Sequence, residues 1–242
     1  MEEKLVETRN IHKWFGKVHA LAGVDLEVGY DEIVGLVGDN GAGKSTLIKV
    51  LIGYHEPDRG EIYFEGKRVN FASPADARKM GIEVVYQDQA LAPDMSISRN
   101  VFMGKEPTGS LGFLDRRKMD TESMKALERI GLHLRSPDVA VATLSGGQKQ
   151  GVAIARVLYF RAKLVILDEP TIALSIKEAR QVLKFVENLK EERISVIFIT
   201  HNLYHIFPIA DRFVVLSHGK KVGDLRKEST SIDKLSELIV SG

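Results

Sequence analysis

A glycine-rich stretch near the start of the chain, Gly38–Thr46, carries residue types that can bind the phosphates of a nucleotide. Its sequence GDNGAGKST fits the pattern G-x-x-x-x-G-K-S/T. The glycines allow backbone N–H groups to turn toward a phosphate, and the start of a following helix adds free N–H groups and the positive end of its dipole. We expect Lys44 to reach the β- and γ-phosphates and the Ser45 hydroxyl to ligate Mg²⁺. The residues predicted to bind the triphosphate are Gly38, Asp39, Asn40, Gly41, Ala42, Gly43, Lys44, Ser45 and Thr46.

The segments on either side of this loop support the prediction. The apolar run 32–37 before it is typical of a buried strand. The segment 46–52 after it has helical length and ends at Gly53, a residue type that often follows a helix. The alternative, a glycine-rich turn that happens to contain a lysine, does not explain a strand and a helix in these positions. We therefore expect the loop to bind a nucleoside triphosphate.

A second apolar strand, 163–168, ends in two adjacent carboxylates, Asp168 and Glu169. In an open α/β sheet, ligands bind at the carboxyl ends of the strands. Asp168 is expected to hold Mg²⁺ or its waters, and Glu169 to polarise the attacking water. A strand that ends in Asp-Glu is often only a solvated turn, but beside a phosphate loop the pair predicts hydrolysis of the nucleotide.

The remaining pattern predicts an α/β fold. Residues 3–10 and 18–28 are expected to be strands, and Phe15 between them either stacks on a nucleotide base or fills a hairpin or core. Strands alternate with helices up to residue 87 and again from residue 161, which favours a mainly parallel sheet covered on both faces. Residues 88–160 change to helices and turns, including an amphipathic helix 119–130. We expect one domain, 1–242, in which a helical subdomain of about 88–160 is inserted between two core segments of about 1–87 and 161–242.

Composition excludes several classes of protein. The net charge is +1, so nothing in the bulk charge favours nucleic acid or an anionic membrane surface. The chain has no cysteine, and therefore no disulfide or thiolate metal site. The start is polar and acidic, unlike a signal peptide, and apolar runs such as 196–199 are too short to span a bilayer. These features favour a soluble, cytosolic protein.

A third motif lies at 144–148, where LSGGQ opens a predicted helix that runs to about Phe160. Alone, the serine and glycines could be an N-cap and a turn, or a second phosphate-binding helix start. The phosphate loop, Gln87, LSGGQ, the pair Asp168-Glu169 and Thr200-His201 occur in this order. Together they resemble the nucleotide-binding domain of ATP-binding cassette (ABC) proteins over essentially the whole chain. The resemblance implies a P-loop NTPase fold with a RecA-like core, an antiparallel β subdomain and an inserted α-helical subdomain.

The resemblance also implies how ATP is held. Two such domains close head to tail, with each ATP between the phosphate loop of one copy and the signature of the other, formed by Leu144, Ser145, Gly146, Gly147 and Gln148. Phe15 matches the aromatic residue that stacks on adenine, more often a tyrosine. Gln87 matches the residue that contacts Mg²⁺ and the water and senses the transport partner, so the implied metal contacts are Ser45, Gln87 and Asp168. His201 matches the histidine that contacts the γ-phosphate.

One departure from the usual pattern indicates a narrower class. The loop after the carboxylates ends in Ser175, where most ABC domains have aspartate. Serine or threonine at this place resembles the ATPases of monosaccharide importers, as do the segments 84–106 and 200–224. This implies a subunit that binds and hydrolyses ATP, pairs with itself, and docks on membrane permease subunits at the inner face of the cell membrane, with a substrate-binding protein as an indirect partner. The alternatives are a transporter ATPase with another cargo and, less favoured, a non-transport ABC ATPase acting on ribosomes or DNA; no nucleic-acid partner is expected.

Two further sites are ambiguous in the sequence. The permease is expected to dock near Gln87 and residues 88–104, where an apolar set either forms an exposed patch or fills the core of the helical part: Pro93, Met95, Ile97, Val101 and Phe102. His201 and His205 are four residues apart, and on a helix they could face one metal. HNLYH lacks the glutamate of the zinc-protease motif and has no evident third ligand, so a metal there is disfavoured.

Overall fold

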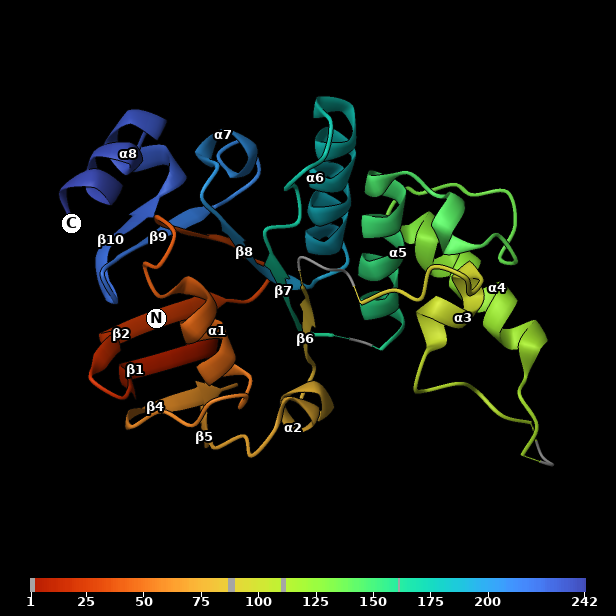
Figure 1. The fold of residues 1–242 in the computed structure, drawn as a ribbon, viewed down its shortest axis with the longest axis horizontal. Coiled ribbons are helices and arrows are strands. Elements are labelled where there is room, and N and C mark those ends of the chain that lie inside the picture. Colours follow the sequence, from red (N-terminus) through yellow and green to blue (C-terminus); the bar gives the residue numbers. More distant parts are fainter. Residues whose placement is uncertain (1–2, 87–89, 110–111, 161) are drawn as a thin grey trace.

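The computed structural model describes residues 3–86, 90–109, 112–160 and 162–242. These residues form two β-sheets that lie side by side with helices packed around them (Figure 1). The fold is the α/β architecture expected from the alternation of strands and helices.

The larger sheet has six strands in the order β10-β9-β3-β8-β7-β6. All neighbouring pairs run parallel except β9 and β10, which form an antiparallel hairpin. The register pairs Val37 with Thr200, and Asp168 with Ile199, so β3, β7 and β8 end at the same edge of the sheet. The strands are β3 (Ile33–Val37), β6 (Ile82–Val85), β7 (Leu164–Asp168), β8 (Ser195–Thr200), β9 (Arg212–Ser217) and β10 (Lys220–Arg226).

The smaller sheet is antiparallel, in the order β2-β1-β4-β5. The first strand is longer than the predicted 3–10, because pairing with β2 resumes after a register shift between Thr8 and Ile11 and continues to Phe15. Asn10, inside that irregularity, has a positive φ of 52°, so the apolar alternation is interrupted there. The strands are β1 (Lys4–Phe15), β2 (Val18–Gly29), β4 (Arg59–Phe64) and β5 (Lys67–Val69).

Most helices begin at a side chain that caps their first turn. Ser145 and Ser175 each form a complete capping box, with Gln148 and Glu178 respectively. Asp115 accepts from Lys118 N, which starts the helix predicted at 119–130 three residues earlier, at Arg116. The helices are α1 (Lys44–Leu51), α2 (Pro74–Lys79), α3 (Ile97–Phe102), α4 (Arg116–Arg129), α5 (Gly146–Tyr159), α6 (Ile176–Glu191), α7 (Leu203–Ile206) and α8 (Ile232–Ser241), with 3₁₀ turns at Val141–Thr143 and Lys227–Ser229.

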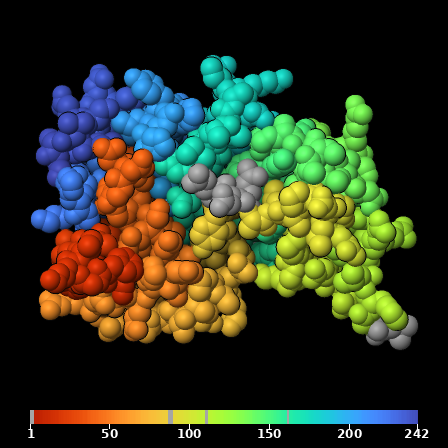
Figure 2. Space-filling model, viewed as in Figure 1, coloured from red at the N-terminus to blue at the C-terminus, as the bar shows by residue number. Residues whose placement is uncertain are grey.

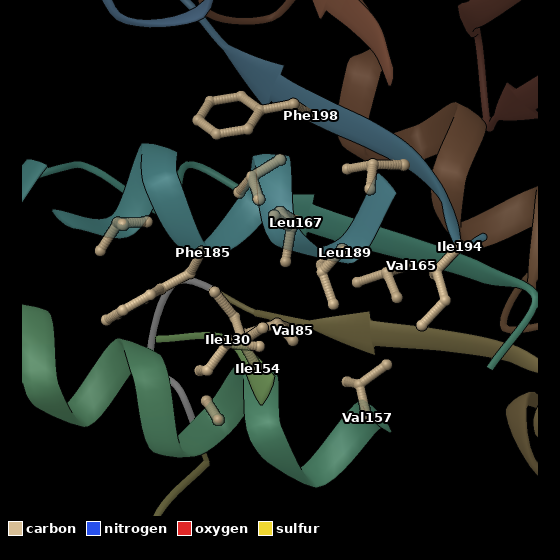
Figure 3. Packing of buried hydrophobic residues seen from close by; sticks show 14 of the residues in the cluster. Val85, Ile130, Ile154, Val157, Val165, Leu167, Phe185, Leu189, Ile194 and Phe198 are labelled. Atoms are coloured by element: carbon tan, nitrogen blue, oxygen red, sulfur yellow. The ribbon is translucent and has the colours of Figure 1, made fainter. Parts of the chain in front are cut away.

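Alternating side chains of the six-stranded sheet divide between two cores. On one face, residues such as Leu167 and Phe198 pack with α5 and α6, as Figure 3 shows for Ile154, Phe185 and their neighbours. On the other face, residues such as Ile166 and Ile199 pack with α1 and the antiparallel sheet. The central strands are therefore buried on both sides, which explains their uninterrupted apolar sequence.

Helices α3, α4 and α5 pack together as a lobe at one side of the molecule (Figures 1 and 2). Their contacts divide the apolar set of residues 93–102. Ile97, Val101 and Phe102 are fully buried, whereas Pro93 and Met95 are exposed. For the three residues on α3 the second alternative, the core of the helical part, is therefore the one observed, because that helix turns their side chains toward α4 and α5.

Across the described ranges, no helix is long and apolar enough to cross a membrane.

Candidate nucleotide-binding site

The glycine-rich loop connects β3 to α1 at the carboxyl edge of the larger sheet. Gly38 lies directly against β9, where an added Cβ would come within 2.2 Å of the Leu216 carbonyl oxygen. Only glycine fits that approach, and the positive φ of 103° at Gly43 then turns the chain into α1. The loop is consequently held in one curved path against the sheet.

Lys44 is the first residue of α1 and is buried, with 7% of its surface exposed. Its Nζ donates to the carbonyl oxygens of Gly38 at 2.7 Å and Asp39 at 2.9 Å. Burial lowers the pKa of the ammonium, and nearby carboxylates, Glu169 foremost, oppose that shift. The lysine therefore places a buried positive charge inside the curve of the loop.

Asp168 and Glu169 lie at the end of β7, next but one to β3 in the sheet. Glu169 adopts a positive φ of 49°, an unfavourable conformation for a residue with a side chain. Its carboxylate is held by the end of β8, since it accepts from Thr200 Oγ1 at 3.1 Å and from His201 N at 3.1 Å. Burial and then the Glu169 charge raise the pKa of Asp168.

His201 also contacts Glu169 through its ring, with 2.7 Å between Nδ1 and Oε1. A carboxylate oxygen accepts, so Nδ1–H is the donor in this hydrogen bond. His201 lies before α7, so the prediction that it shares a helix with His205 was wrong. His205 instead makes a separate contact, from Nδ1 to Thr171 Oγ1 at 2.9 Å.

One cavity of 590 Å³ brings together much of this chemistry. The phosphate loop from Asn40 to Thr46 lines it, and so do Asp168 and Glu169. The other lining residues come from the β1–β2 and β9–β10 hairpins and belong to none of the predicted motifs. Among these residues, only the His218-Gly219 pair between β9 and β10 forms a recognisable sequence pattern. That pattern predicts a turn and not a binding site. These residues are Val18, His19, Ala20, His218 and Gly219.

Phe15 lies at the tip of the β1–β2 hairpin rather than in a core, with 43% of its surface exposed. Its ring meets His55 edge-on, with 5.1 Å between centroids. The alternative of a core aromatic was therefore wrong, while the hairpin position is compatible with stacking on a base.

Leu144–Gln148 lead into α5, away from the residues that line this cavity. Ser145 Oγ accepts from Gln148 N at 3.3 Å, and Gln148 Oε1 accepts from Ser145 N at 3.0 Å. None of these five residues lines the cavity that the phosphate loop lines. Gln87 lies outside the described residues.

A phosphate loop between a parallel strand and a helix, with carboxylates at the end of a neighbouring strand, defines the class of P-loop nucleoside triphosphatases. Comparison with protein families narrows the class. Residues 21–172 match the model of the ABC transporter family, so the chain belongs to that family and is one of its ATP-hydrolysing cassettes.

Individual relatives agree with this assignment. The chain is 49% identical to the xylose/arabinose import ATP-binding protein XylG of Sulfolobus acidocaldarius, over 98% of this chain and 94% of that protein. It is 42% identical to the fructose import ATP-binding protein FrcA of Rhizobium meliloti, over 91% of this chain and 88% of that protein.

Solved structures give the same family. The ADP conformation of MJ1267, an ATP-binding cassette of an ABC transporter, is 27% identical with a TM-score of 0.85, over 98% of this chain and 95% of that one. The dimeric post-hydrolysis structure of the cassette MJ0796, bound to ADP and Pi, is 25% identical with a TM-score of 0.78, over 93% of this chain and all of that one.

Proposed function

We propose that this chain powers the import of a sugar, a monosaccharide, through a membrane permease. The observation that carries the proposal is the 49% identity to a xylose/arabinose import ATP-binding protein across nearly the full length of both chains. The fructose import protein supports the same substrate class. Cargo other than a sugar is the second candidate, because the permease rather than the ATPase contacts the cargo.

We infer the roles of the site residues from their positions and the family resemblance. The loop amides of residues 38–46 and the Lys44 ammonium bind the phosphates of ATP. We propose that Glu169 accepts a proton from the attacking water and that His201, which contacts its carboxylate, interacts with the γ-phosphate. Gln87 contacts the metal and the water, as the resemblance implies.

Ser45 and Asp168 are the described residues that would hold Mg²⁺. Both line the same cavity, and oxygen atoms of this kind are the ligands that Mg²⁺ prefers. A dication beside Asp168 would stabilise its ionised form and oppose the effect of burial on its pKa. Bound together with ATP, the metal would neutralise charge on the β- and γ-phosphates.

The proposed assembly is a dimer of this chain docked on permease subunits at the inner face of the membrane. Leu144, Ser145, Gly146, Gly147 and Gln148 of one copy would close over the ATP of the other. We propose that the chain is a single domain in which residues 88–160 form the helical subdomain, and that exposed Pro93 and Met95 lie on its permease-facing side. Within one copy none of the five signature residues lines the cavity, which supports an arrangement in which a second copy completes each site.

Phe15→Ala is expected to weaken ATP binding by about 5- to 150-fold, the loss that follows from removing one aromatic ring stacked on a base. Tripolyphosphate has no base, so its affinity should stay the same, and Phe15→Tyr should bind ATP normally. Titration calorimetry with ATP and with tripolyphosphate distinguishes a ring that stacks on the base from a ring that supports the loop. An equal loss for ATP and tripolyphosphate would show that the ring supports the loop and not the base.

The proposed function is tested by sugar uptake in the source organism after its gene is replaced by the Glu169→Gln variant. Uptake of radiolabelled xylose, arabinose, ribose and fructose should be measured, with leucine as the control solute. We expect uptake of at least one sugar to fall to background while leucine uptake is unchanged. Normal uptake of all four sugars, with loss of another solute, would replace the sugar assignment with a different cargo.

A further inference from the structure

The first turns of α5 and α6 meet at a single carboxylate, that of Glu178. One oxygen of Glu178 completes the capping box of its own helix: Oε2 accepts from Ser175 N at 3.1 Å and from Ser175 Oγ at 2.7 Å. The other oxygen reaches a different helix, where Oε1 accepts from Gly147 N at 3.3 Å. Glu178 thus connects the start of α5 to the start of α6.

Close backbone packing accompanies this contact. A Cβ added at Gly147 would lie 3.1 Å from Glu178 Cβ, and one added at Gly146 would lie 2.7 Å from Leu174 Cδ2. The two glycines of the signature therefore have a packing role within one copy of the chain, besides any role toward a phosphate. Larger residues would push α6 away and lengthen the Gly147–Glu178 hydrogen bond.

The position also favours a permanent negative charge. The carboxylate faces the N-terminal ends of two helices, where backbone dipoles stabilise anions. Hydrogen bonds, first from the Ser175 hydroxyl and then from the backbone N–H groups of Ser175 and Gly147, lower the pKa of Glu178 to about 2. The side chain is therefore ionised at any physiological pH.

The loop 169–175, between β7 and α6, is held by hydrogen bonds at several positions. Ile172 N donates to the Glu169 carbonyl oxygen at 3.1 Å, and Thr171 Oγ1 contacts His205 Nδ1 at 2.9 Å. The loop then ends at Ser175, which Glu178 holds. A chain of contacts consequently runs from Glu169 through this loop to Gly147.

We propose that Glu178 is a positioning residue that fixes the signature, Ser145–Gln148, relative to the hydrolytic carboxylates of the same chain. This inference rests on the proposed function, in which the signature serves the ATP held by a second copy. A shift of the 169–175 loop in one ATP site would then move the signature that closes the other site. Because Ser175 provides the contact through its backbone and hydroxyl, the link does not require aspartate at that position.

Two measurements test the proposal in the full chain carrying Glu169→Gln. The first is ATP-driven dimerisation by light scattering, with ATP binding to the dilute monomer as the reference. Glu178→Ala should raise the protein concentration needed for dimerisation about tenfold, the loss expected for one charge-assisted hydrogen bond, while monomer binding stays within about twofold. Glu178→Gln keeps an acceptor oxygen, so the protein concentration it needs for dimerisation should lie between those of the parent protein and Glu178→Ala. Glu187→Ala, on the same helix and paired at the surface with Lys184, is the matched control.

The second measurement is hydrogen exchange of residues 144–149 in the nucleotide-free monomer. We expect both Glu178 variants to speed exchange there, while the Glu187 control does not. Unchanged exchange would overturn the proposal whatever the dimer does, because Glu178 would then only cap α6. If the parent protein binds ATP but stays monomeric, closure requires the permease or a second kind of subunit, and exchange alone decides the role of Glu178. If Glu178→Ala fails to fold, Glu178→Gln provides the same comparisons.

Discussion

Glu169→Gln is expected to lower ATP turnover by about 10²–10⁴-fold, the usual contribution of a general base, while ATP binding survives. Glutamine has the same shape and keeps an oxygen that can accept from His201 Nδ1, so the local structure should change little. It cannot accept a proton from water, so the step that activates the nucleophile is lost. The phosphate loop and Lys44, which bind ATP, are untouched by the substitution.

The measurement is phosphate release at saturating ATP, together with ATP binding by calorimetry and solution mass by light scattering. A protein that binds ATP without hydrolysing it should accumulate as a dimer, and the mass should return to that of a monomer when ATP is removed. Glu187→Gln on the exposed side of α6 is the control and should behave as the natural protein. Normal turnover in Glu169→Gln would exclude Glu169 as the base. A variant that binds ATP and stays monomeric would mean that closure requires the permease or a second kind of subunit.

Phe102→Ala is expected to reduce the free energy of unfolding by about 3–5 kcal/mol, the usual cost of removing a buried phenylalanine. Phe102 is fully buried on α3 and meets the ring of Tyr159 on α5 edge-on, with 4.3 Å between centroids. Its loss would open a cavity between these two helices. Since small domains are stable by only about 5–15 kcal/mol, the variant should be close to unfolding at moderate temperature.

Met95→Asp is the matched comparison for Phe102→Ala, because Met95 and Phe102 belong to the same apolar set in the sequence. Met95 is 41% exposed, so we expect a change within about 0.5 kcal/mol. Urea unfolding followed by circular dichroism gives both values, and an unchanged slope with urea would show that only stability differs. A stable Phe102→Ala protein would contradict the packing of α3 against α5. Loss of sugar uptake in a stable Met95→Asp protein would support a permease contact at this position.

Much of the fold could be predicted from the sequence because the determining signals are local. Strand β7, Leu164–Asp168, lies within one residue of the predicted 163–168, since its apolar run is buried on both faces and ends at polar residues. Helix α6 begins where a serine and a glutamate three residues later form a capping box. The phosphate loop was recognisable because its glycines, lysine and serine are required within one short segment.

Contacts between distant segments were not predictable in the same way. The exposure of Met95 and the burial of Phe102 depend on how α3 is turned against α4 and α5, which neither residue type reveals. The first strand reached Phe15 only through its pairing with β2. The hairpin residues that line the cavity, such as His19 and His218, carry no motif.

The sequence by itself determined that this chain binds and hydrolyses a nucleotide and belongs to the ABC cassettes, because those properties depend on motifs whose residues are close together in the chain. Only the tertiary structure placed Glu169 against His201 and Glu178 against Gly147. Each of these pairs joins residues about thirty positions apart, and their contact depends on the order of strands in the sheet and on the packing of α5 against α6. Hydrogen bonds act only over about 3 Å. Which residues contact the catalytic carboxylate and the signature is therefore decided by the tertiary structure.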